Sequence, residues 1–113
     1  MEGLQKLLRE IEDGIKEMGF IEPKSVDGKI TKTEAEIRFL PSSRGKFEAF
    51  CDYFSNRNYK DVKIELNIAK DDYQGRWHIK IYCENGKPNE DKVILTHALT
   101  QLKREIHDYK LRN

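Results

Sequence analysis

The stretch VKIELNIAKDDYQGRWHIKIYC, residues 62–83, decides the fold of this chain. Apolar side chains occupy every second position in both of its halves: Val62, Ile64, Leu66 and Ile68, then Trp77, Ile79, Ile81 and Cys83. This alternation is typical of a strand with one dry face and one wet face. Because the connection, residues 70–75, is polar and ends in Gly75, the sequence predicts a β-hairpin.

Helices are predicted on both sides of the hairpin, where apolar residues recur at steps of three and four. The first, residues 4–18, presents Leu4, Leu8, Ile11, Ile15 and Met18 on one face. The second, residues 46–57, presents Phe47, Phe50, Cys51 and Phe54. The third follows Asn89, which is a good N-cap, and presents Leu95, Leu99, Leu102, Ile106 and Tyr109.

The segment between the first two helices is expected to form a weaker hairpin. Pro23 reduces residues 20–26 to an edge strand or an extended loop, because proline cannot donate to a sheet ladder. Asp27-Gly28 is typical of a tight turn. Beyond this turn, apolar residues alternate again as far as Leu40, which predicts a strand over residues 29–40.

These elements predict one α+β domain over residues 1–113, in the order α-(β)β-α-ββ-α. Short turns join the strands, so we expect a mainly antiparallel sheet of three to four strands. Each strand has a single dry face, so we expect the helices to cover one face of the sheet.

Composition excludes some classes of protein. The chain has 21 Lys and Arg against 20 Asp and Glu, a net charge of +1, which predicts no strong field for nucleic acid. No apolar run is long enough to span a bilayer, so we expect no membrane contact. The first residues lack a signal peptide, and Cys51 and Cys83 lack metal-site spacing. We therefore expect two reduced thiols and a cytoplasmic protein.

A second candidate function depends on cations around the middle helix. The loop at residues 41–46, PSSRGK, is small and basic and leads into a helix, where backbone N–H groups can hold a phosphate. It lacks the spacing of a Walker loop. Further cations follow the helix, so the candidate phosphate-binding residues are Arg44, Lys46, Arg57 and Lys60. They would form the local basic rim of a weak nucleic-acid or phosphate-ligand binding protein.

The wet face of the sheet is expected to be solvated and held by cross-strand ion pairs, with partner binding as the alternative. Its predicted residues are Glu34, Glu36, Arg38, Lys63, Glu65, Asn67, Arg76, His78, Lys80 and Tyr82. A platform for single-stranded nucleic acid needs exposed aromatic residues in a basic groove. Only Tyr82 is aromatic in this set, and three glutamates oppose the cations, which argues against nucleic acid on this face.

Catalysis is not expected. His78, His97 and His107 belong to no metal or protease motif, and both thiols lie on predicted dry faces. A metal-dependent nuclease could use Asp72, His78 and Lys80, but such spacings are common in a chain that is 36% charged. We predict neither catalytic residues nor a metal or cofactor site.

The leading hypothesis is a small non-enzymatic binding protein that acts by protein contact, as an adaptor, inhibitor or regulatory subunit. Three helices over one small dry face leave one apolar stripe in surplus, and a twofold contact is the commonest way to bury it. We therefore predict a homodimer or a complex with another protein through the first or last helix. The candidate contact residues are Leu95, Leu99, Leu102, Ile106 and Tyr109.

Overall fold

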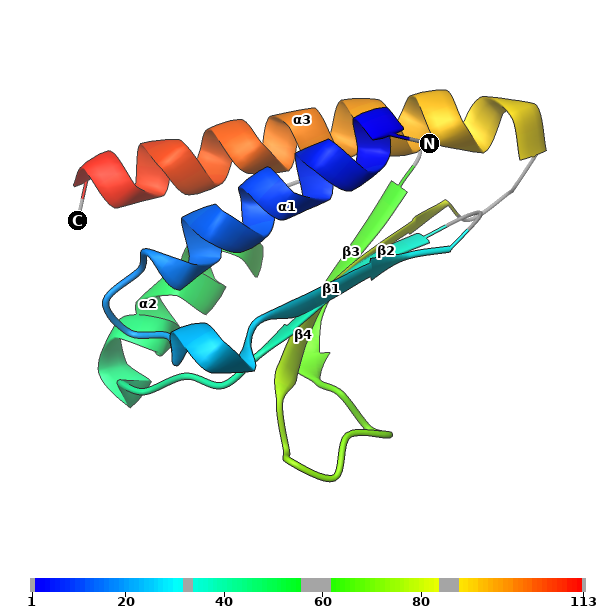
Figure 1. The fold of residues 1–113 in the computed structure, drawn as a ribbon. Coiled ribbons are helices and arrows are strands. Elements are labelled where there is room, and N and C mark those ends of the chain that lie inside the picture. Colours follow the sequence, from blue (N-terminus) through cyan, green and yellow to red (C-terminus); the bar gives the residue numbers. More distant parts are fainter. Residues whose placement is uncertain (1, 32–33, 56–61, 84–87, 113) are drawn as a thin grey trace.

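The computed structural model describes residues 2–31, 34–55, 62–83 and 88–112 (Figure 1). Three helices are present in this part of the chain: α1 (Glu2–Lys16), α2 (Arg44–Ser55) and α3 (Pro88–Arg112). A 3₁₀ turn, η1 (Pro23–Ser25), precedes four strands: β1 (Asp27–Ile30), β2 (Glu34–Phe39), β3 (Val62–Ile68) and β4 (Trp77–Cys83). The α+β class and the order of elements are therefore confirmed.

The four strands form one antiparallel sheet in the order β1-β2-β4-β3. The predicted β3–β4 hairpin is present, and its apolar residues share a face, since Ile64 lies opposite Ile81 and Leu66 opposite Ile79. Ile37 of β2 lies on the other side of Ile79. Because opposite residues share a face, the predicted dry row is continuous across these three strands. β1 and β3 are the two edges of the sheet.

The turn predicted at Asp27-Gly28 is wrong. Both residues lie within β1, opposite Arg38 and Ile37 of β2, and the chain reverses between Ile30 and Glu34. Gly28 serves packing instead: a Cβ there would collide with the Glu12 carboxylate and come within 3.2 Å of a Leu8 methyl. The glycine thus lets β1 approach α1 closely, which a local turn rule cannot detect.

Helices α1 and α3 run side by side over one face of the sheet (Figure 1). They approach closely at Gly14, where a Cβ would lie 3.3 Å from the Ile106 side chain. Two ion pairs, Glu10–Lys103 and Glu17–Lys110, join the helices along their exposed seam. The helix layer over the sheet therefore consists of α1 and α3 together.

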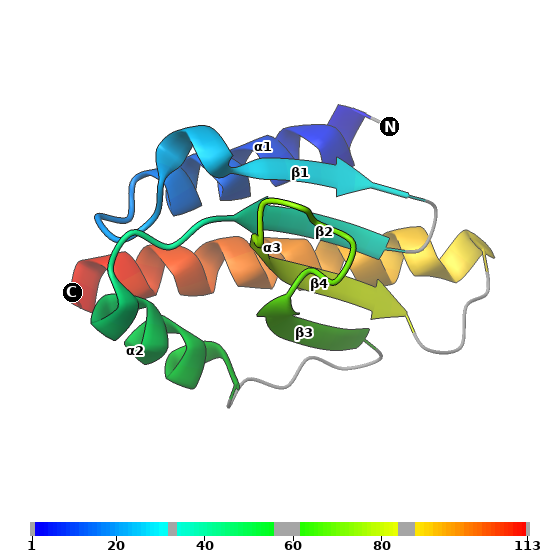
Figure 2. The same cartoon turned by 90° about the horizontal axis from the view of Figure 1, so that it is seen from below.

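Helix α2 lies beyond the end of the sheet (Figure 2). Aromatic side chains connect it to the sheet and to α3. The Phe47 ring is 4.9 Å from that of Trp77, and the Phe50 ring is 5.5 Å from that of Tyr109. Burying a side chain of this size stabilises the fold by about 1.5–3 kcal/mol. No helix of the described residues has both the length and the apolar character to cross a membrane.

Candidate functional site

The apolar stripe predicted as a partner surface on α3 lies in the core. Leu95, Leu99 and Leu102 are fully enclosed, and Ile106 and Tyr109 are 2% and 6% exposed. The surplus that motivated the prediction does not exist in this conformation, because α2 packs at the end of the sheet and leaves its dry face to α1 and α3. A partner therefore reaches the three enclosed leucines only by displacing parts of the fold that pack over them.

The predicted basic rim is not brought together by the described residues. Arg44 and Lys46 are both exposed in the first turn of α2. The Arg44 guanidinium donates to Glu48 at 3.0 Å and lines a hollow beside Trp77. Lys46 lines a different hollow, beside Tyr109 and Lys110. Arg57 and Lys60 lie outside the described residues.

The wet face of the sheet carries the predicted residues but is not open along its whole length. The β3–β4 loop, residues 69–76, folds back across this face, on the side away from the helices (Figures 1 and 2). Arg38 of β2 fixes the loop there. Its Nη2 donates to Asp71 Oδ1 at 2.8 Å, and its Nη1 donates to Asp72 Oδ2 at 3.2 Å. The loop therefore covers one end of the face that was expected to be solvated.

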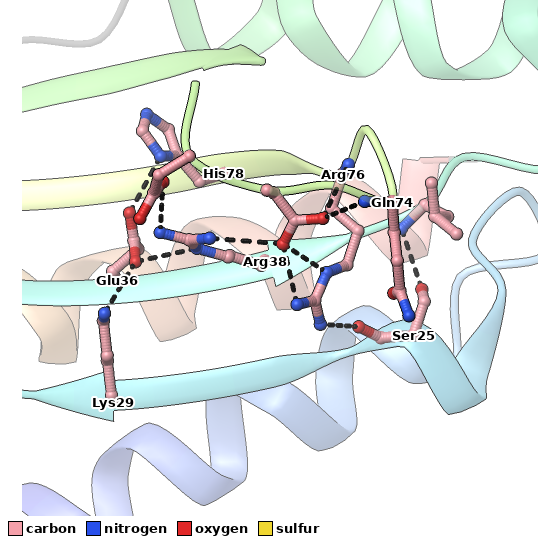
Figure 3. Close-up of polar contacts among 10 residues, drawn as sticks. Ser25, Lys29, Glu36, Arg38, Gln74, Arg76 and His78 are labelled. Carbon is pink, nitrogen blue, oxygen red and sulfur yellow. Dashed lines mark hydrogen bonds and ion pairs between the residues drawn. The ribbon is translucent and has the colours of Figure 1, made fainter. Parts of the chain in front are cut away.

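Asp72 is the centre of this loop, and its side chain is only 2% exposed. One carboxylate oxygen accepts the Gln74 backbone N–H at 2.9 Å, and the other accepts Nε–H of Arg76 at 2.8 Å (Figure 3). Gly75 follows with a φ of +74°, a left-handed conformation that glycine adopts without strain. The hydrogen bonds that the Asp72 carboxylate accepts hold its pKa well below its usual range, and the bond from Arg76 has the largest effect.

Glu36 and His78 extend the same polar network toward the middle of the sheet (Figure 3). His78 Nδ1 lies 2.9 Å from one Glu36 carboxylate oxygen, and Arg38 Nε donates to the other at 3.0 Å. Burial opposes ionisation of Glu36, but the hydrogen bond and charge of Arg38, with the charges of His78 and Lys29, lower its pKa overall. Glu36 and His78 are 5% and 8% exposed, so this network is internal to the fold.

A carboxylate beside an imidazole is the arrangement that orients a general base, but its geometry here is unsuited to that role. The second ring nitrogen of His78, Nε2, is buried and has no hydrogen-bond partner among the described residues. A general base must instead present that atom to a substrate. Among the residues described, no three His, Cys, Asp or Glu side chains are grouped to hold a metal.

The same face is hollowed beside the loop, with a cavity of about 520 Å³. Cations and carboxylates of both signs line it: Lys29, Lys70 and Lys80, with Glu34, Glu65 and Asp71. Lys80 Nζ lies 3.6 Å from Glu34 Oε2, and Lys29 Nζ lies 3.6 Å from Glu36 Oε1. The charges compensate one another, so the hollow offers no excess of either sign to an ionic ligand.

The β3 edge of the sheet is less covered than the two central strands. Ile37, Ile79 and Ile81 on the helix side of β2 and β4 are at most 2% exposed. In contrast, Ile64 and Leu66, which lie in the same rows on β3, are only half-buried. Ile68 at the end of the strand is 53% exposed. The helices therefore cover β3 only in part.

The backbone of β3 also directs hydrogen-bonding groups outward at this edge, where the described part of the chain offers them no paired strand. The Ala69 N–H donates to the Arg76 carbonyl at 2.9 Å, which fixes the alternation of the β3–β4 ladder. Lys63, Glu65 and Asn67 consequently direct their backbone groups toward β4. Every other residue of β3, namely Val62, Ile64, Leu66 and Ile68, directs its N–H and C=O away from the sheet, where no further strand of the described residues pairs with them.

A hollow of about 740 Å³ continues this edge between β3 and α2, and charged side chains line part of it: Arg44, Glu48 and Asp52. Leu66, Trp77, Phe47 and Cys51 form its apolar lining. Burial, with the nearby charges of Asp52 and Glu48, raises the pKa of the Cys51 thiol to about 11. The thiol is therefore protonated at neutral pH and contributes apolar surface rather than a nucleophile.

Comparisons of the chain with protein families, with curated proteins and with solved structures found no match. The features of interest therefore come from the structure alone. Sequence reasoning missed both the loop that folds back and the exposed β3 edge. The spacing of Asp72 and Arg76 was a signal for the loop, whereas the exposure of β3 depends on strand order, which local patterns do not reveal.

Proposed function

We propose that this chain is a small non-enzymatic binding protein that acts by protein contact at the β3 edge of its sheet. It would serve as an adaptor, inhibitor or regulatory subunit. The observation that carries the proposal is the partly buried row of Val62, Ile64 and Leu66 beside outward-directed backbone groups. An extended segment of a partner would pair with that backbone, as in strand addition to an exposed sheet edge.

Two further features support this mode of binding. The hollow lined by Leu66 and Trp77 lies beside the edge and can take an apolar side chain of the added segment. The network of Arg38 and Asp72 anchors the hairpin loop, which holds β3 in a fixed register before binding. A preorganised edge binds more tightly because less conformational entropy is lost on association.

A non-enzymatic role is part of the proposal, and the buried Nε2 of His78 and the protonated Cys51 thiol support it. A phosphate ligand is less well supported, because Arg44 and Lys46 line separate hollows and Arg44 is paired with Glu48. The two half-buried thiols, Cys51 and Cys83, suit a reducing compartment, so we propose the cytoplasm as its location.

Selection of short peptides by display against the immobilised domain tests the proposal. Binding peptides should shift and protect the backbone amides of Val62, Ile64, Leu66 and Ile68 in NMR spectra. Ile68→Lys should weaken binding, whereas Val93→Lys should not, although the two side chains are similarly exposed at 53% and 57%. Peptides that map to another element, or that ignore Ile68→Lys, would overturn the assignment of the edge.

A further inference from the structure

We propose that the segment added to the β3 edge is β3 of a second copy of this chain, antiparallel to it, with Ile64 opposite Ile64 of that copy. This inference rests on the proposed function and names the partner. The resulting dimer would continue the sheet through its two β3 strands. It differs from a dimer through helix stripes, because those stripes are buried in the core.

The backbone geometry permits this register. Residues that exchange hydrogen bonds across an antiparallel pair must both direct their backbone groups toward the partner. In β3 these are the even-numbered residues, as the Ala69–Arg76 hydrogen bond establishes. When Ile64 lies opposite Ile64 of the second copy, Val62 of each copy lies opposite Leu66 of the other. Every hydrogen-bonded pair then joins two outward-directed residues.

The side chains favour this register over the two neighbouring registers that the backbone permits. On the wet face, Lys63 of each copy lies opposite Glu65 of the other, which gives two symmetric pairs of opposite charge. Sliding one strand by two residues brings Glu65 opposite Glu65 or Lys63 opposite Lys63, depending on the direction. Like charges directly opposite one another are destabilising. The segment Val62–Leu66 is therefore complementary to itself in one register.

The apolar side of the strand gains from the same arrangement. Directly opposite residues lie on the same face, so the twofold axis is perpendicular to the sheet and both helix layers lie on one side. The half-buried rows of Val62, Ile64 and Leu66 from the two copies then meet between these layers. The dimer thus covers the part of the dry face that α1 and α3 leave exposed.

Sedimentation equilibrium of the whole chain, from about 10 μM to about 1 mM, tests the proposal with charge-reversed variants. Lys63→Glu and Glu65→Lys each place like charges opposite one another, so each should raise the dimer dissociation constant at least about tenfold. An equimolar mixture of the two variants brings opposite charges together again and should dimerise. The doubly substituted chain, Lys63→Glu with Glu65→Lys, should dimerise like the wild type.

Lys24→Glu, an exposed reversal on η1 far from this edge, is the control and should leave the dimer unchanged. Glu65 accepts a hydrogen bond from Tyr82 at 3.2 Å, so circular dichroism checks that each variant folds. If Glu65→Lys unfolds, Lys63→Glu alone decides. A wild type that stays monomeric at about 1 mM, or a dimer indifferent to Lys63→Glu, overturns the second copy as partner. The peptide selection still decides whether the β3 edge binds another protein.

Discussion

Arg38 and Asp72 are 34 residues apart in the sequence, yet the Arg38 guanidinium donates to the Asp72 carboxylate at 3.2 Å across the wet face of the sheet. The same guanidinium holds Glu36 at 3.0 Å and Asp71 at 2.8 Å. The Arg38 side chain of β2 therefore links the middle of the sheet to the loop between β3 and β4. It fixes the position of the hairpin that carries the proposed edge.

Arg38→Met should destabilise the fold by about 2 kcal/mol, because it leaves the buried Glu36 carboxylate without its strongest donor. Arg44→Met is the matched control, since it removes an exposed ion pair with Glu48 and should cost less than about 1 kcal/mol. Urea denaturation followed by circular dichroism measures both. Equal small costs would mean that Arg38 does not hold the network together.

Acid should weaken the fold through the same network. The folded-state pKa values of Glu36, Asp71 and Asp72 lie below their ordinary values, so these groups stabilise the fold above the unfolded pKa of about 4. That stabilisation is lost as the pH falls through the lowered values. Glu12, whose pKa burial raises, has the opposite dependence.

The free energy of unfolding should therefore fall as the pH is lowered from about 5 to about 2, because the unfolded chain takes up protons at these carboxylates before the folded chain does. Arg38→Met removes the Arg38 hydrogen bonds that help to lower these pKa values, so the stability of this variant should depend less steeply on pH. Arg44→Met should follow the wild type. Parallel curves for wild type and Arg38→Met would contradict the role of the Arg38 hydrogen bonds in lowering these pKa values.

A pair of proline substitutions tests the direction of the β3 backbone groups. Asn67 and Ile68 are adjacent and exposed, but only the Asn67 N–H points toward β4. Asn67→Pro should therefore cost about 2 kcal/mol more than Ile68→Pro, because it removes a ladder hydrogen bond. Thermal and urea unfolding measure the difference. A larger cost at Ile68 would mean that the outward face of β3 is wrongly assigned.

The close packing of β1 under α1 gives a further prediction. Gly28→Ala should destabilise the fold by about 1–2 kcal/mol, because the added methyl group displaces Glu12 and crowds Leu8. Gly45→Ala is the control, since nothing lies within 4 Å of the added carbon in α2. It should be neutral or stabilise the helix by up to about 1 kcal/mol. An unaffected Gly28→Ala variant would contradict the packing explanation for this glycine.

The parts of the fold that depend on periodicity could be predicted from the sequence. The β3–β4 hairpin follows from alternation at Ile64 and Ile79, and α3 follows from the spacing of Leu95 and Leu99. The place of Gly28 within β1 could not be predicted, because this glycine is required by close packing against α1, which is distant in sequence.

Most of the candidate site could not be predicted from the sequence, because it too depends on contacts between distant residues. The return of the loop depends on a contact over 34 residues, between Arg38 and Asp72. The exposure of β3 depends on the order β1-β2-β4-β3, and the same strand patterns would also fit other orders. The surplus apolar stripe was inferred from the number of helices. That inference assumed that all three helices compete for one face of the sheet, whereas α2 packs beyond its end.

Residue-resolved amide hydrogen exchange of β3, measured by NMR in dilute and concentrated solution, tests the central claim most directly. In dilute solution the amides of Val62, Ile64, Leu66 and Ile68 should exchange quickly, and those of Lys63, Glu65 and Asn67 slowly. In concentrated solution, or with a selected peptide, the amides of Ile64 and Leu66 should become protected. Slow exchange of Ile64 and Leu66 in the dilute monomer, or protection that appears on another element, would contradict binding at the β3 edge.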